Sequence, residues 1–184
     1  MQQTHTDNES RRTAALALWR YGNDYLKAAQ GLCDDMRITC NESQVHYHLA
    51  AQGIEFALKS FLRAKGVTPS DLSARIGHSL LDALQEALAR ELPSPPDTVL
   101  RTIHFIAPHH RDDQFLYFVA ADGDFPEFMP MLATGTWILG QVAADVVADY
   151  FAYYGHASTS AVDDMLHRMR ADLHATTSKI RLLQ

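Results

Sequence analysis

The stretch VHYHLAAQGIEFALKSFLRAKG, residues 45–66, constrains the fold more than any other part of the chain. Its apolar residues recur at helical spacing, and Gly66 ends the pattern. At about 100° per residue they cover most of a helix circumference. We therefore predict a helix over about 43–65 that neighbouring helices cover on most sides. The apolar positions are Leu49, Ala50, Gly53, Ile54, Ala57, Leu58, Phe61 and Leu62.

One ribbon of polar side chains interrupts this apolar surface, within an arc of about 100°. Glu55 and Lys59 stand four residues apart in the order that favours an ion pair. Two interpretations stay open at this point. The ribbon is a binding site in which Glu55 acts as a base or acceptor, or it is a solvated face with a surface pair worth a few tenths of a kcal/mol, on the order of 0.3. The ribbon comprises Gln44, His48, Gln52, Glu55, Lys59 and Arg63.

Helical spacing of apolar residues predicts five further helices. A loop containing Pro69 precedes the third helix, and Pro108 is expected to end the fourth. Ser79 with Asp82 predicts a capping box at the start of the third helix. The expected ranges are about 13–36, 79–92, 97–107, 127–154 and 160–182, with a second capping box at Ser160 and Asp163 and a buried row of Leu80, Leu81, Leu84 and Leu88.

The segment of about 109–126 does not follow a helical pattern and ends in an acidic, proline-containing turn. Its aromatic residues Phe115, Tyr117 and Phe118 follow Arg111. Such a run could stack on a base or clamp a ligand, or it could wedge between helices as core. The sequence leaves both uses open.

These elements predict an all-α protein, an up-and-down helical bundle of five to six helices in a single domain over 1–184. Residues 1–10 are expected to form a loose tail. The helix over 160–182 has a narrow apolar seam, which suits packing against one partner helix. We therefore regard it as a candidate dimerisation or docking arm.

Charge and terminal composition exclude several classes of protein. A formal net charge of −6 argues against a large phosphate-binding face. The polar N-terminus MQQTHTDNES lacks a signal core, so Cys33 and Cys40 are expected to be free thiols in a reducing cytoplasm. The apolar run MLATGTWILGQVAADVVADYF contains glycines and aspartates, which favours a buried helix over a membrane span.

The sequence contains ten histidines but no motif with metal-ligand spacing. We therefore predict no metal and no cofactor. His78 differs from the others because it stands directly before a helix start. It is expected either to orient that loop or to join Glu55 in a site. Motifs for a serine nucleophile or a phosphate loop are absent from the sequence.

The segments AAQGIEFALKSFLRAKG and GHSLLDALQEAL together resemble the HEPN superfamily of small helical proteins. RDDQFLYF, with the acidic turn after it, is similar to the segment before the last core helix in some members. The resemblance covers about 45–155. The positions that carry it are Glu55, Leu58, Lys59, Gly66, His78 and Leu80.

This resemblance implies a helical bundle that is frequently dimeric. The superfamily includes metal-independent ribonucleases of toxin–antitoxin and defence systems, and non-catalytic partners of nucleotidyltransferases. The nucleases use an Arg and a His with a short spacer, which meet their copies across a dimer and cleave RNA with the help of the ribose 2′-hydroxyl. The corresponding pair here is Arg168 and His174, beyond the region of resemblance. Six positions on a helix separate them by about 120°, which disfavours joint action.

We therefore predict a non-catalytic, cytoplasmic HEPN-like binding or accessory module of a toxin–antitoxin or defence system. The implied partners are a second copy of the chain and a nucleotidyltransferase or antitoxin. A ribonuclease toxin acting on RNA through Arg168 and His174 is the first alternative. The second is a small-ligand or nucleotide-binding helical protein whose site residues are Glu55, Lys59, His78, Arg111 and Tyr117.

Overall fold

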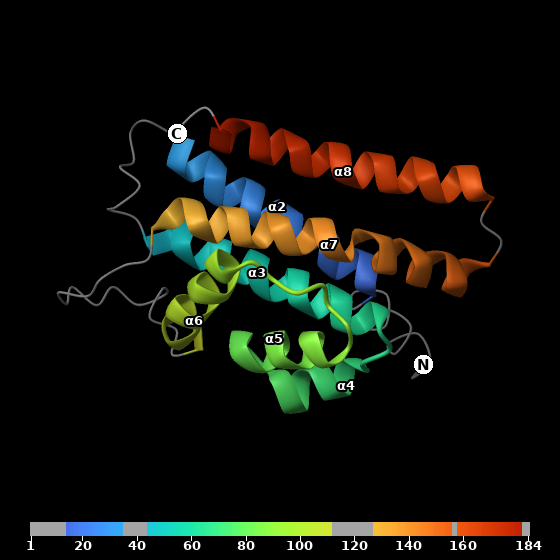
Figure 1. Cartoon of the computed structure of the whole chain (residues 1–184), viewed down its shortest axis with the longest axis horizontal. Coiled ribbons are helices and arrows are strands. Elements are labelled where there is room, and N and C mark those ends of the chain that lie inside the picture. Colours follow the sequence, from blue (N-terminus) through green and yellow to red (C-terminus); the bar gives the residue numbers. More distant parts are fainter. Residues whose placement is uncertain (1–13, 35–43, 112–126, 156–157, 182–184) are drawn as a thin grey trace, which may run out of the picture.

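The computed structural model describes residues 14–34, 44–111, 127–155 and 158–181. Across these ranges every element is helical, which confirms the predicted all-α bundle. Four long helices lie along the long axis of the molecule, and two shorter ones cover one side of α3 (Figure 1). Their bounds are α2 Ala15–Asp34, α3 Gln44–Ala64, α5 Leu80–Ala89, α6 Asp97–Arg111, α7 Phe128–Tyr154 and α8 Thr159–Arg181.

Helix α3 is the hub of the bundle, as its apolar circumference predicts. It contacts α2 and α7 on one side and α5 and α6 on the other, and Leu58 and Phe61 are fully buried. Helices α2 and α3 approach closely because both carry a glycine where they meet. A Cβ atom at Gly22 would lie only 3.1 Å from the carbonyl oxygen of Gly53. The two helix backbones therefore pack directly against each other at these glycines.

Helix α7 is long and apolar enough to cross a membrane by length and composition alone. Within the bundle, 56% of its most apolar window is buried. Its fully buried residues Ile138, Leu139 and Val142 belong to the main core. Packing against α2, α3 and α6 therefore accounts for the hydropathy of this helix.

The segment after Gly66 is not the loop that Pro69 suggested. It forms the short helix α4, Pro69–Asp71, followed by the π-helical turn η1, Leu72–Ile76. Thr68 caps α4, because its side chain accepts a hydrogen bond from the Asp71 backbone N–H at 3.1 Å. Pro69 fits the first helical position, where no N–H is needed. The turn buries Leu72 and Ile76 against the core.

Helix α5 begins as predicted, but it buries a different face. Ser79 caps it, since its Oγ accepts from the Asp82 backbone N–H at 3.2 Å. The predicted burial of Leu81 and Leu88 is wrong, because these side chains are 37% and 40% exposed. The buried face follows one helical stripe with steps of three, one and three, and its positions are Leu80, Ala83, Leu84 and Ala87.

Helix α6 continues through Pro108 to Arg111, so the predicted helix end at Pro108 is wrong. Proline removes one backbone donor, and here the missing bond would have reached the carbonyl of His104 in an exposed turn. That carbonyl can bond to water instead, and the helix continues to His110, which is buried one half-turn later. The predicted irregular segment therefore does not include 109–111, and its remainder, 112–126, lies outside the described residues.

Helix α8 packs on α7 and α2 of its own chain through the predicted narrow seam, in which Met169 and Leu173 are buried. The predicted cap at Ser160 is wrong. The Oγ of Ser158 accepts from the Ala161 backbone N–H at 3.3 Å, and the helix begins one residue earlier than expected.

The prediction of free thiols is wrong for Cys33, which is disulfide-bonded. The other cysteine of the sequence, Cys40, lies outside the described residues, as does the predicted tail over 1–10.

Candidate functional site

Four side chains from three parts of the chain meet at the carboxylate of Glu55. We call Glu55, Lys59, His78 and His110 the Glu55 centre. Lys59 Nζ lies 2.5 Å from Oε1 of Glu55, and Nε2 of His110 lies 2.6 Å from Oε2. Nδ1 of His78 lies 3.2 Å from both carboxylate oxygens. The carboxylate is thus shared among one ammonium and two imidazole groups.

Each element presents its residue to the centre for a local reason. Glu55 and Lys59 are one turn apart on α3, on the side of that helix that α5 and α6 cover. His78 stands between η1 and α5, where Gly77 takes a φ of +54°, a value that glycine adopts without strain. His110 lies in the last turn of α6. Closure of α5 and α6 onto α3 therefore assembles the centre.

The centre is buried at its base and open at one side. The side chains of Glu55 and His110 are each 2% exposed, whereas that of His78 is 73% exposed. Lys59 is intermediate. A solvated face with a weak surface pair is therefore the wrong interpretation for Glu55. His78 forms the side of the centre that a solute can reach.

The electrostatics of the centre favour an ionised Glu55. Burial alone would raise the pKa of this carboxyl group. The hydrogen bond from His110 and the charge and hydrogen bond of Lys59 outweigh burial, so the pKa falls from 4.5 to about 2. The carboxylate is consequently a permanent acceptor at neutral pH, and it is unsuited to act as a general base there.

This shift predicts a specific loss of stability in acid. Because the pKa of Glu55 is lowered on folding, its contribution is present above pH 4.5 and is lost as the pH falls towards 2. We expect the unfolding free energy of the wild type to fall by about 3 kcal/mol more than that of Glu55→Gln across this window. Urea unfolding of both proteins at a series of pH values between 6 and 2.5 measures the difference. Parallel pH profiles would contradict the assigned shift.

The sequence predicted three members of the Glu55 centre and missed the fourth. The structure brings the side chains of Glu55, Lys59 and His78 into contact. His110 was missed because the helix was expected to end at Pro108. A signal was present in the spacing, since Ile103, Ile106, Ala107 and His110 follow one helical stripe, and all are buried.

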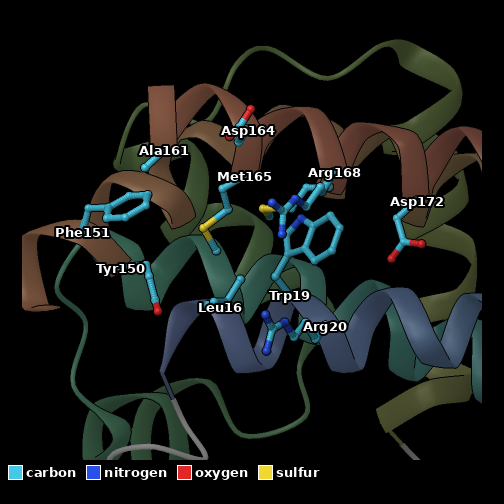
Figure 2. Close-up of a pocket in the computed structure, with 11 residues that line it drawn as sticks. Leu16, Trp19, Arg20, Tyr150, Phe151, Ala161, Asp164, Met165, Arg168 and Asp172 are labelled. Atoms are coloured by element: carbon cyan, nitrogen blue, oxygen red, sulfur yellow. The ribbon is translucent and has the colours of Figure 1, made fainter. Parts of the chain in front are cut away.

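A second feature is a cavity of about 650 Å³ between α2, the end of α7 and α8. We call it the α8 pocket. Met165, Arg168 and Asp172 point from α8 towards α2, and Trp19 points from α2 towards them (Figure 2). The indole N–H of Trp19 donates to the Leu139 carbonyl oxygen at 3.0 Å, which holds its ring in place. Tyr150 and Phe151 of α7 close one end of the cavity.

Some charged side chains of the α8 pocket are paired with an opposite charge, and others are not. Asp172 is bound by Lys27 at 2.9 Å and by the side-chain amide of Asn23 at 3.1 Å. Arg20 and Arg168 are exposed, and neither forms an ion pair or hydrogen bond with the described part of the chain. Two guanidinium groups therefore remain available beside an aromatic wall.

The remaining predicted site residues are dispersed. Arg168 lines the α8 pocket, while His174 is exposed on α8 and is not among the pocket residues. Arg111 is exposed at the end of α6, directly after His110. Tyr117 lies outside the described residues. The structure thus does not assemble the predicted set as one site.

Comparison with protein-family models, curated proteins and solved structures yields no significant match.

Proposed function

We propose that this protein is a non-catalytic helical binding module whose α8 pocket takes a small organic anion with an aromatic or apolar body. The observation that carries this proposal is the pairing of two unengaged arginines with an aromatic wall in one cavity. Its volume, about 650 Å³, falls within the range of about 300–1,000 Å³ common for small-molecule sites.

The charges around the cavity indicate that the ligand is an anion. Arg20 and Arg168 supply two positive charges, while Lys27 offsets the charge of Asp172. Asp164 is the remaining carboxylate in the lining, so one positive charge is left in excess. Arginine binds carboxylate and phosphate groups in a bidentate manner. A carboxylate or phosphate monoester on the ligand would therefore meet a guanidinium group.

The residues that line the cavity indicate that the ligand also has an aromatic or apolar body. Trp19 and Met169 line the cavity as buried core residues, only 2% and 6% exposed, and the half-buried Met165 offers a flexible thioether that adapts to irregular shapes. Tyr150 and Phe151 pack against each other with ring centroids 5.2 Å apart at the far end. A nucleoside monophosphate or an aryl phosphate combines both required properties.

Fluorescence titration tests the pocket. We expect phenyl phosphate and adenosine monophosphate to quench Trp19, and adenosine, which lacks the charge, to bind much more weakly. Arg168→Gln should weaken binding by roughly ten- to a hundredfold, because a charge-assisted hydrogen bond contributes about 1.5–3 kcal/mol. Arg170→Gln is the matched control, since Arg170 is exposed on the same helix outside the lining.

Three results would contradict the proposal. If neither phosphate binds, or if both variants bind equally well, the pocket is not an anion site. Cleavage of RNA by the wild type, abolished by Arg168→Ala and by His174→Ala, would replace the binding module by a ribonuclease.

The relationship to HEPN proteins remains part of this proposal. It is supported by the all-α bundle and by the meeting of three motif residues, Glu55, Lys59 and His78. The implied homodimer and the nucleotidyltransferase or antitoxin partner belong to the same proposal. Light scattering on the purified chain tests the dimer, and a monomeric mass would contradict it.

A further inference from the structure

The Glu55 centre contains the donor set of a transition-metal site. We propose that Glu55, His78 and His110 bind a divalent ion of the zinc class. One ligand atom from each residue lies within 4.8 Å of the other two. The three residues come from α3, the start of α5 and the end of α6, so the ion would join three elements. This site is separate from the α8 pocket, which α2, α7 and α8 line.

Two of the three ligand contacts are close to the spacing around a bound ion, and the third, between the two imidazole nitrogens, lies within 4.8 Å. Ligands about 2.0–2.1 Å from a tetrahedral zinc ion lie about 3.3 Å from one another. The contact between His78 Nδ1 and the Glu55 carboxylate already measures 3.2 Å. The contact between His110 Nε2 and Glu55 Oε2 measures 2.6 Å and must open by about 0.7 Å. The ring of His78 is largely exposed and free to close on the ion.

The ring protons of the two histidines can be placed so that both rings bind the ion. Each histidine binds an ion as a neutral imidazole, with the ring proton on its other nitrogen. That proton would sit on Nδ1 of His110 and on Nε2 of His78, whose side chain is 73% exposed. The ion then replaces the hydrogen bonds that the two rings now make to Oε2, while Lys59 stays on Oε1.

The donor chemistry selects the class of ion. Two imidazole nitrogens and one carboxylate oxygen suit zinc, cobalt, nickel and ferrous iron. Magnesium and calcium prefer sites made of oxygen ligands alone. Magnesium is therefore a negative control for the same site.

Lys59 distinguishes a metal site from a purely structural ion-pair cluster. Its ammonium group lies on the carboxylate that would bind the ion, and like charges repel. Lys59→Met should therefore tighten zinc binding, by roughly tenfold, because a positive charge about 5 Å from the ion is removed. A cluster that serves folding alone predicts no such gain.

Calorimetric titration with zinc chloride, after treatment with a chelator, tests the proposal on the full chain. We expect one ion per chain in the wild type and binding weaker by more than about tenfold in His78→Ala. His78 is exposed, so this variant should fold, and circular dichroism checks that it does. His104→Ala is the matched control, because His104 is exposed on α6 outside the centre. Cobalt should give visible bands typical of nitrogen and oxygen ligands, without thiolate absorption.

The outcomes separate cleanly. Stoichiometric binding lost in His78→Ala, kept in His104→Ala and tightened in Lys59→Met supports the site. Absence of zinc binding, or equal binding in the two histidine variants, overturns it. Neither result bears on the phosphate titration of the α8 pocket, so the two proposals fail independently.

Discussion

Replacing Glu55 by alanine is expected to lower the free energy of unfolding by roughly 3–5 kcal/mol, the usual cost of removing one partner from a buried ion pair. The carboxylate is 2% exposed and accepts from Lys59, His78 and His110. Truncation leaves the buried imidazole of His110 without this acceptor, and it leaves Lys59 beside an apolar core. Urea unfolding followed by circular dichroism measures the change.

Glu86→Ala is the matched control for this prediction. Glu86 pairs with Arg90 at 2.8 Å across the same four-residue spacing that joins Glu55 to Lys59. Its side chain is 25% exposed, so we expect a loss below about 1 kcal/mol. Glu55→Gln, which keeps one acceptor oxygen, should fall between the two. Equal losses in Glu55→Ala and Glu86→Ala would show that burial adds nothing to the pair.

Leu26→Ala is the second large effect, expected to cost about 2–5 kcal/mol through the cavity it leaves. Leu26 of α2 is fully buried and lies between two glycines of other helices. A Cβ atom at Gly53 of α3 would come within 2.8 Å of its Cγ, and one at Gly135 of α7 within 2.7 Å of its Cδ1. One side chain thus fills the junction of three helices, so thermal unfolding should report the loss.

A double-mutant cycle isolates this junction. Gly135→Ala alone should destabilise by about 1–3 kcal/mol, because the added methyl group overlaps Leu26. In the Leu26→Ala background the same change should cost much less, since the space is then free. Gly31→Ala is the control, because a Cβ atom there meets nothing within 4 Å, and we expect it to stabilise by about 0.5–1 kcal/mol. Additive effects at Leu26 and Gly135 would contradict the packing described.

The two kinds of site differ in how far the sequence could predict them. Glu55 and Lys59 share a helical stripe, and His78 was placed near them because it precedes a helix start. The α8 pocket had no local signal, since Trp19, Tyr150 and Arg168 come from three helices far apart in the chain. Arg168 was singled out for its spacing from His174, whereas its neighbours in space are Trp19 and Met165 (Figure 2).

The helical class, the approximate helix ranges and the central place of residues 45–65 could all be predicted from the sequence. These follow from periodicity and capping, which act over a few neighbouring residues. The burial of Glu55 and its contact with His110 became visible only in the folded chain. The same holds for Ala83 and Ala87, which replace Leu81 and Leu88 in the core. Periodicity states which side chains share a face of a helix. Which neighbour covers that face depends on how whole helices pack, and that is settled by contacts between residues distant in sequence.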